Sequence, residues 1–429
     1  MQPVNVQGNG QLTMTAGAIP EVPISDLQGR LNARVRRIPI EGVIETTFRC
    51  NLKCVHCYVN EPVGDRAVRD REMSLERLKR LVDEVADAGC LDLLFTGGEV
   101  LVRPDFPELY LYAVRKGLLV TVFTNGTMVT DRIADLFDEY RPFNIEITLY
   151  GMTRETYEKV TGLPGSYEMC LRGIQRLVSR GIPLRLKAMA LTWNQHEIPA
   201  MEAYARSLGL KFKFDGFLNP RVDCGADRNG ELQLTAEQVI ALDLEVPGRM
   251  EEFKKFCEEN VLSRAPIDSE YVYSCGAGQM SFTVDPYGKL QMCQLSRRSG
   301  FDLRNDTFDR GWNEFFPMLR ERKWRSNTVC RNCNLVTLCS SCPGAAEMET
   351  GDIEGIVAQF CEIAHLRAHT ALGDDCGHRA DATCCLGHGK LLARPQEEVD
   401  RVMASALCGS SPSGPEIKPV LIQIDRCAA

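Results

Sequence analysis

The spacing of apolar residues changes repeatedly between Val43 and Phe217. Short apolar runs, which are typical of buried strands, alternate with longer segments in which apolar residues recur every three or four positions, as on one face of a helix. This alternation is typical of repeated βα units with a parallel sheet. Strands are predicted at Val43–Phe48, Leu91–Phe95, Leu119–Phe123, Asn144–Leu149, Leu184–Leu191 and Lys211–Asp215.

Helices are predicted between these strands. The clearest begins after Ser74, a good N-cap residue, and its apolar side chains from Leu75 to Val85 recur at helical spacing. Further helices are predicted at Phe106–Arg115, Asp131–Glu139, Tyr167–Arg180 and Glu197–Leu208, and one beyond the last strand near Arg249–Glu259.

Three cysteines, Cys50, Cys54 and Cys57, directly follow the first predicted strand. Three thiols this close together can bind one iron–sulfur cluster but leave one of its irons without a protein ligand. Buried structural thiols and part of a zinc site are the alternatives, although zinc prefers four protein ligands and disulfides need an oxidising compartment. The CxxxCxxC spacing, followed by the aromatic residue Tyr58, resembles the cluster-binding motif of radical S-adenosylmethionine (SAM) enzymes.

The resemblance implies a catalytic role for these three cysteines and a [4Fe-4S] cluster that binds SAM, with Tyr58 near the cofactor. In that family an electron from the cluster breaks the sulfonium bond of SAM and gives a 5'-deoxyadenosyl radical, while the protein orients the cofactor. It also implies an α/β fold with a partial (β/α)6 TIM-like barrel, whose site lies at the carboxyl ends of the strands. An electron donor such as flavodoxin or ferredoxin is implied as a partner.

The loops after the second and third strands carry further family motifs. Gly97, Gly98 and Glu99 match the GGE motif, which holds the methionyl amino group of SAM in the family. Glycines let a ligand approach the backbone, and a carboxylate accepts hydrogen bonds from an ammonium group. Thr124 and Asn125 belong to a TNG sequence that is also frequent in the family and suits ribose or carboxylate contacts. An Asn-Gly turn without a cofactor role is the alternative.

The fourth strand ends in a sequence that departs from the family pattern. Thr148 keeps the hydroxyl expected near the cofactor carboxylate, but Tyr150 stands where many relatives carry an acid. Lys187 or Lys159 is expected to pair with the same carboxylate, and we favour Lys187. Its structural alternative is a strand residue that extends its amine to water.

A second group of cysteines occupies the C-terminal half, and a hairpin is predicted there from Met280–Val284 and Lys289–Cys293 around a turn at 285–288. The order of the group resembles the SPASM domain, which holds two auxiliary [4Fe-4S] clusters, except that two residues rather than the usual three separate Cys339 from Cys342. The resemblance implies one cluster on Cys330, Cys333, Cys339 and Cys361 and another on Cys275, Cys293 and Cys342.

The second of these ligand sets is one residue short. Cys224 and Cys257 are candidates for the missing ligand, and an iron left open for a substrate or another ligand is the alternative. A zinc ribbon built from the four central cysteines is also conceivable, but it would leave the other three cysteines of the group without a role.

Composition narrows the classes of function. The 429 residues suffice for two domains, and 19 cysteines in clustered spacings favour metal ligation in a reducing compartment. A net charge of −8 disfavours nucleic acid as a partner. Neither a membrane span nor a signal peptide is evident, so a cytoplasmic protein without a membrane partner is expected.

The expected organisation is a lead-in at 1–37, the barrel at 38–218, a bridging segment at 219–269, the SPASM-type domain at 270–372 and a cysteine-containing tail at 373–429. The tail is either a third metal site or a thiol-rich accessory segment, with a helix expected near Pro395–Leu407.

Together these features predict an enzyme that cleaves SAM reductively and abstracts hydrogen from its substrate. The preferred substrate is a ribosomally synthesised peptide that becomes crosslinked by a thioether or carbon–carbon bond, because this two-domain resemblance most often has that role. One alternative is dehydrogenation or decarboxylation of a small molecule in cofactor or antibiotic biosynthesis. The other is a non-catalytic electron carrier, which would not need the GGE and TNG loops.

Overall fold

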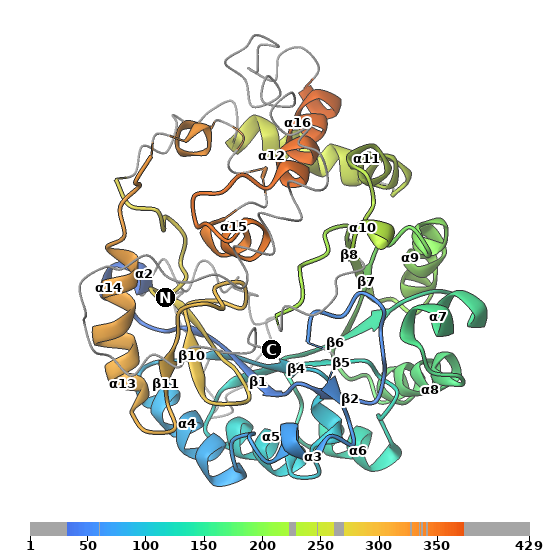
Figure 1. Cartoon of the computed structure of the whole chain (residues 1–429). Helices are drawn as coiled ribbons and strands as arrows, with labels where there is room; N and C mark the ends of the chain where they lie inside the picture. Colours follow the sequence, from blue (N-terminus) through green and yellow to red (C-terminus); the bar gives the residue numbers. More distant parts are fainter. Residues whose placement is uncertain are drawn as a thin grey trace, which may run out of the picture.

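The computed structural model describes residues 32–59, 61–222, 229–246, 248–260, 270–326, 328–333, 335, 338–339 and 342–372. Most of the expected lead-in, Cys224 and the whole of the tail, including its predicted helix, lie outside these residues. The described chain forms a mixed α/β fold around one large sheet, with strand order β11-β10-β9-β1-β4-β5-β6-β7-β8 (Figure 1).

Six parallel strands form the barrel part of this sheet: β1 (Glu41–Thr47), β4 (Asp92–Gly97), β5 (Leu119–Thr124), β6 (Asn144–Leu149), β7 (Leu184–Met189) and β8 (Lys211–Asp215). They confirm the six predicted strands to within two residues at each end. They also confirm the prediction of a partial barrel with a parallel sheet.

Helices cover the outer face of these strands (Figure 1). They are α4 (Leu75–Asp87), α5 (Phe106–Arg115), α6 (Asp131–Glu139), α7 (Arg154–Thr161), α8 (Ser166–Ser179) and α9 (Ile198–Ser207). The Ser74 hydroxyl accepts a hydrogen bond from the Arg77 amide and caps α4, as predicted. Of these six helices, α7 alone was not predicted. Its eight residues contain just two apolar side chains, Tyr157 and Val160, so no helical spacing is visible.

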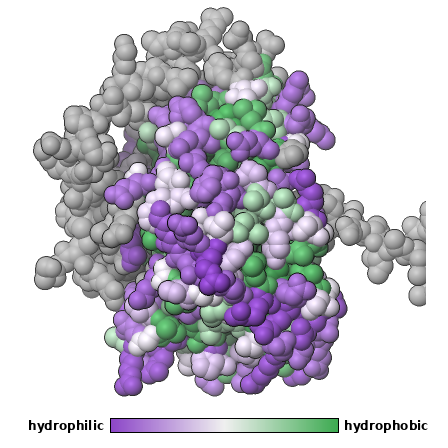
Figure 2. Space-filling model, turned by 90° about the vertical axis from the view of Figure 1, so that its right-hand side faces the viewer, coloured by the Kyte–Doolittle hydropathy of each residue, from purple (hydrophilic) through white to green (hydrophobic). Residues whose placement is uncertain are grey.

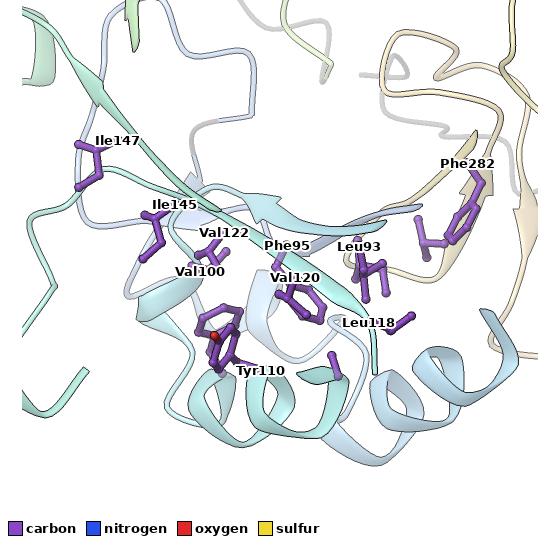
Figure 3. Close-up of a cluster of buried hydrophobic side chains, with 14 of the residues drawn as sticks. Leu93, Phe95, Val100, Tyr110, Leu118, Val120, Val122, Ile145, Ile147 and Phe282 are labelled. Atoms are coloured by element: carbon purple, nitrogen blue, oxygen red, sulfur yellow. The ribbon is translucent and has the colours of Figure 1, made fainter. Parts of the chain in front are cut away.

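Side chains alternate between the two faces of the sheet. Leu93, Phe95, Val120, Val122, Ile145 and Ile147 are at most 1% exposed and point toward the helices around Tyr110 (Figure 3). The intervening positions, which carry Glu45, Glu146 and Lys187, therefore face the interior of the barrel. The outer face supplies the hydrophobic core, and the inner face is left for polar chemistry.

The cysteine-rich region continues the same sheet. The predicted hairpin is present as β9 (Ser281–Val284) and β10 (Lys289–Gln291), followed by β11 (Phe301–Asp302). Strand β9 runs parallel to β1, with Glu41 opposite Ser281 and Ile44 opposite Val284. The sheet thus crosses the boundary expected at residue 270, and the hairpin lies beside the strand that leads to Cys50.

Further helices follow the barrel strands in the chain. In the bridging segment and the C-terminal region they are α10 (Asn229–Leu232), α11 (Ala236–Glu245), α12 (Arg249–Asn260), α13 (Phe308–Arg310), α14 (Phe316–Arg320), α15 (Pro343–Thr350) and α16 (Ala358–Leu372). Helices α11, α12 and α16 lie together (Figure 1). Asp243, fully buried on α11, pairs with Arg249 at 2.6 Å and with Arg367 at 2.9 Å and so joins all three helices.

Short elements complete the described chain: helices α2 (Ala33–Arg36) and α3 (Arg66–Arg69) and the paired strands β2 (Arg49–Cys50) and β3 (Glu61–Pro62). No helix among the described residues is both long and apolar enough to span a bilayer. On the face drawn in Figure 2, hydrophilic residues lie between smaller hydrophobic areas.

Candidate active site

The loop with the first three cysteines leaves the sheet at the carboxyl end of β1. Strand β2 carries Cys50, and the chain returns through β3. The amides of Lys53 and Val55 donate hydrogen bonds to the carbonyl oxygens of Thr161 and Val160, at 2.8 and 3.0 Å, at the end of α7. The loop is thus fixed at both of its ends and in its middle.

The structure brings Cys50, Cys54 and Cys57, hereafter the cluster triad, close together. Cys54 is 9% exposed, and the other two thiols are half-buried. Burial raises the pKa of Cys54, and negative charge on Cys57 and Cys50 raises it further. Burial and the Glu99 carboxylate raise the pKa of Cys50 to about 12. Three thiolates this close together repel one another, so they need a bound cation or cluster to remain ionised together.

Hydrogen-bond donors surround the sulfur atoms of the triad. The Leu52 amide and the Asn125 side-chain amide donate to Cys50 Sγ at 3.4 and 3.7 Å. The Tyr150 side chain lowers the pKa of Cys54 and so opposes part of the rise that burial causes. The Nδ1 atom of His56, between Cys54 and Cys57, is buried without a hydrogen-bond partner among the described atoms. Donors around thiolates suit an iron–sulfur cluster, so these residues fit the group implied by the sequence.

The GGE loop lies against the start of this cysteine loop. The amides of Gly98 and Glu99 donate to the carbonyl oxygens of Thr47 and Arg49 at 2.7 and 3.0 Å. A Cβ atom on Gly97 would lie 2.1 Å from the Thr47 oxygen, and one on Gly98 would lie 2.3 Å from the Arg49 oxygen. These glycines therefore lie directly against the backbone at 47–49, where only glycine fits. Their expected role in the approach of a ligand stays a prediction.

Glu99 links the second and third loops of the barrel. Its carboxylate is fully buried and accepts hydrogen bonds from the Leu101 amide at 3.1 Å, the Thr124 hydroxyl at 2.7 Å and the Asn125 amide at 2.7 Å. Burial raises its pKa, and these hydrogen bonds oppose that rise. A carboxylate offers about four acceptor positions, so about one is left for an ammonium group.

Asn125 also belongs to a polar network beside the triad. Its side-chain nitrogen donates to Asn51 Oδ1 at 2.9 Å, and its side-chain oxygen accepts from the Thr127 amide at 2.9 Å. Asn51 in turn donates to the Thr127 hydroxyl at 2.9 Å. The TNG sequence therefore forms a turn that contacts the cysteine loop, and its role in binding the cofactor stays a prediction.

Lys187 lies on the inner face of the barrel next to Thr148, its neighbour across β6 and β7. Its amine is 3.3 Å from a carboxylate oxygen of Glu146 and 3.1 Å from the ring centre of Phe123. Burial lowers the pKa of Lys187 to about 8 although Glu146 opposes the effect. Glu146 was not predicted as a site residue, although the alternation of side chains along β6 could have placed it on this face.

The other basic candidate, Lys159, lies elsewhere. Its amine is 4.3 Å from the ring centre of Trp193, a cation–π contact. Of the two lysines, Lys187 is therefore the one that faces the barrel interior.

Tyr58 lies beside a buried ion pair that the sequence did not reveal. The Arg297 guanidinium donates to both carboxylate oxygens of Glu45, at 2.6 and 2.8 Å. Burial raises the pKa of Tyr58, the Glu45 charge raises it further, and Arg297 lowers it. Glu45 belongs to β1 and Arg297 follows the hairpin, so the pair joins the two cysteine regions.

Three C-terminal cysteines also come together. Burial raises the pKa of Cys293 to about 11, and the thiolates of Cys342 and Cys275 contribute to the rise. Cys342 caps α15, where its sulfur accepts a hydrogen bond from the Ala345 amide at 3.4 Å. The set expected to hold one auxiliary cluster is thus assembled around the hairpin.

Cys257 does not lie with this set. It is fully buried on α12 in an apolar cluster with Leu335 and Leu338, and Cys333 and Cys339 pack against the same cluster. The packing of α12 on α16 brings it to the other group of cysteines. Its role as the missing ligand beside Cys275 stays a prediction.

Among the residues that the structure describes, no three His, Cys, Asp or Glu side chains converge closely enough for a single metal ion. The thiolates of a [4Fe-4S] cluster bind different irons and need not converge on one atom.

Comparison with known proteins agrees with this geometry. The family model described as "Radical SAM superfamily" matches residues 44–202, which include the cluster triad and the GGE loop. Residues 44–202 of this chain thus match the radical SAM superfamily. A solved structure shares its fold: Streptococcus suis SuiB bound to its precursor peptide SuiA has a TM-score of 0.60, with 16% identity over 78% of this chain and 80% of that one.

Several curated proteins are also similar. The subtilosin biosynthesis protein AlbA of Bacillus subtilis is 28% identical over 67% of this chain and 62% of its own length. The mycofactocin maturase MftC of Mycobacterium ulcerans is 28% identical over 73% and 85%. Fe-coproporphyrin III synthase of Methanosarcina barkeri is 37% identical, but over only 36% and 38%. The chain thus spans less than two thirds of the length of AlbA and of the coproporphyrin enzyme.

Proposed function

We propose that this radical SAM protein cleaves SAM reductively and abstracts hydrogen from a ribosomally synthesised peptide, which it crosslinks through a thioether or carbon–carbon bond. The observation that carries the proposal is the assembly of the cluster triad against the GGE loop. Relatives named as a bacteriocin biosynthesis protein, a mycofactocin maturase and a PqqA peptide cyclase support a peptide as the substrate.

The cluster triad would hold a [4Fe-4S] cluster, which with bound SAM supplies the 5'-deoxyadenosyl radical. Glu99 orients the TNG loop and offers its remaining acceptor position to the amino group of SAM. Thr148 and Lys187 lie on the inner face of the barrel, where a hydroxyl and a cation suit the cofactor carboxylate. Tyr58 and the buried wall formed by Cys54 and Glu99 shield the site from water.

The C-terminal cysteines would hold two auxiliary clusters. Because β9 pairs with β1, the hairpin that leads to Cys293 belongs to the same sheet as the strand that leads to the cluster triad. This continuity supports electron transfer between the two regions during peptide oxidation, with an external protein such as flavodoxin or ferredoxin as the first donor.

A tetrapyrrole is the second candidate substrate. The AdoMet-dependent heme synthase of Methanosarcina barkeri is 26% identical over 73% of this chain and 92% of its own length, and the coproporphyrin enzyme has the highest identity quoted above. These relatives favour small-molecule chemistry on the same barrel.

The test uses protein whose clusters are reconstituted anaerobically. With dithionite and SAM, formation of 5'-deoxyadenosine is expected, and its absence from fully iron-loaded protein would favour an electron carrier. Short peptides encoded next to the gene and iron coproporphyrin are then supplied in parallel, and the products are analysed by mass spectrometry. A peptide that loses two hydrogens per crosslink supports the first proposal, whereas turnover of the porphyrin alone overturns it.

A further inference from the structure

The inner face of β7 and β8 carries a concentration of positive charge. Arg185 lies opposite Lys211, and Lys187 lies opposite Lys213, in the parallel register of the two strands. Residues opposite each other on neighbouring strands, and residues two positions apart on one strand, point to the same side of a sheet. These four side chains, hereafter the cationic wall, therefore all face the interior of the barrel, as Lys187 does.

The carboxylates on this part of the inner face do not balance the charge of the wall. A carboxylate oxygen of Glu146, on β6, lies 3.3 Å from the Lys187 amine and 3.1 Å from the Lys213 amine. Asp215, at the end of β8, accepts a hydrogen bond from an amide of the following loop at 3.0 Å. Within the described chain, neither of the other two members of the wall forms an ion pair. Four cations thus face two carboxylates, and a net positive charge remains.

The stability of the sheet does not account for this arrangement. Like charges directly opposite each other on neighbouring strands are destabilising. Strand β8 ends the sheet, and lysines on an edge strand can prevent pairing with another chain (Figure 1). Strand β7 is not an edge, yet it carries Arg185 and Lys187, and the Lys187 side chain is only 20% exposed. Protection of an edge requires no half-buried lysine one strand further in, so the wall suits an anionic ligand better.

The wall extends from the proposed cofactor site to solvent. Lys187 lies next to Thr148, where the carboxylate of SAM is proposed to bind. The Lys213 side chain is 58% exposed, and Arg185 and Lys211 are exposed as well. A substrate can therefore contact the outer three cations while Lys187 remains with Glu146 and the cofactor.

Ammonium and guanidinium groups form charge-assisted hydrogen bonds with carboxylates, and a surface of one sign attracts ligands of the other. The wall is positive although the chain as a whole has a net charge of −8. We propose that Arg185, Lys211 and Lys213 bind carboxylates of the substrate, so that the peptide modified by this protein carries glutamate or aspartate near its reacting residue. The inference names the class of peptide and so rests on the proposed function.

The spacing of the wall suggests which peptide to test. Cations two residues apart on a strand lie about 6.6 Å apart, which is also the separation of alternate side chains in an extended peptide. The probe is a short peptide with three glutamates at alternate positions, and its twin carries glutamine at the same positions. Isothermal titration calorimetry measures the affinity of both for the reconstituted holoenzyme with SAM bound.

The wild type is expected to bind the glutamate peptide about tenfold more tightly than its twin, because each exposed ion pair contributes a factor of up to about five. This preference should shrink between about 50 and 300 mM salt, since salt screens exposed charges. Equal affinities for the two peptides at low salt would overturn the inference.

A triple variant, Arg185→Gln/Lys211→Gln/Lys213→Gln, tests whether the wall causes the preference. The matched control is Lys323→Gln, which removes a lysine with a side chain 57% exposed, outside the wall. The triple variant should bind both peptides equally, while Lys323→Gln keeps the preference for glutamate. A preference that persists in the folded triple variant would overturn the inference.

A single charge reversal decides the matter if the triple variant does not fold. Lys213→Glu should bind a third peptide, with lysine in place of the glutamates, more tightly than the glutamate peptide. A purely structural role of Lys213 predicts no such exchange of preference, and its absence would overturn the inference.

Iron coproporphyrin III is titrated in the same way, because its propionates are a second source of carboxylates. Weaker binding of the glutamate peptide by the triple variant supports the inference, whereas weaker binding of the porphyrin alone overturns it. These measurements need no turnover. Wild-type protein that prefers the glutamate peptide but forms no 5'-deoxyadenosine would therefore overturn the proposed function and leave the acidic ligand of the wall in place.

Discussion

The ion pair between Glu45 and Arg297 gives a quantitative prediction about how the two cysteine regions are held together. Glu45 is fully buried on β1, and the side chain of Arg297 is 10% exposed. Replacing Arg297 by Met removes both of its hydrogen bonds to Glu45 and leaves a buried carboxylate without that cation. Loss of one partner from a buried pair typically costs ~3–5 kcal/mol.

Hydrogen exchange followed by mass spectrometry measures this cost locally, on the peptide that contains β1. Since ~1.4 kcal/mol corresponds to a tenfold change in an equilibrium constant, amide exchange in β1 should become about 10² to 10⁴ times faster in Arg297→Met. The double variant Glu45→Gln/Arg297→Met should exchange more slowly than Arg297→Met, because no unpaired charge remains.

The control is Lys323→Met, which breaks the pair between Lys323 and Glu270, 2.6 Å apart, whose side chains are 57% and 62% exposed. Exposed ion pairs contribute at most ~1 kcal/mol to stability, so the rate of amide exchange around Lys323 and Glu270 should change little in Lys323→Met. The reasoning is refuted if Arg297→Met accelerates amide exchange in β1 less than tenfold. It is also refuted if the double variant exchanges as fast as the accelerations of the single variants Glu45→Gln and Arg297→Met multiplied together.

Three further predictions concern the barrel. Alanine at all three positions of the cluster triad should abolish 5'-deoxyadenosine formation while iron analysis still finds the C-terminal iron; complete loss of iron would contradict two separate regions. Gly98→Ala should cost ~1–3 kcal/mol and weaken SAM binding in equilibrium dialysis, because its Cβ atom meets the backbone of Phe48 and Arg49, whereas Gly64→Ala, with nothing within 4 Å, should do neither. Burial and the neighbouring Glu41 raise the pKa of Asp92 to about 6. The folded state therefore binds the Asp92 proton more tightly than the unfolded state does. This contribution to stability is lost as the pH rises from about 4 to 6. Asp92→Asn should therefore raise the thermal midpoint more at about pH 8 than at about pH 5, and an equal gain at both would contradict that assignment.

The sequence by itself determined the elements whose cause is local. The six barrel strands followed from short apolar runs, and α4 to α6 followed from helical spacing and, for α4, from its N-cap. The turn between β9 and β10 followed from the residues at 285–288. In each case the interactions that define the element join residues close together in the chain, so their pattern is visible in the sequence.

Motifs also determined which loops approach one another. The cysteine spacing and the GGE sequence identified two loops that the structure places in contact. The motifs did not determine the contacts that these loops make. The glycines lie against the backbone at 47–49, and the Glu99 carboxylate accepts hydrogen bonds from the TNG loop. A motif records which residue types a place requires, but not which neighbour requires them.

Only the tertiary structure decided how distant segments meet. The pairing of β9 with β1, the ion pair of Glu45 with Arg297, the place of Cys257 beside Cys333 and Cys339, and the contact of Tyr150 with His56 join residues that are tens to hundreds of positions apart. Such contacts depend on the packing of whole elements, and no local period or spacing encodes them. The sequence therefore determined the strands and the cysteine motif, whereas folding decided what surrounds the sulfur atoms, since that environment is built from the ends of separate strands.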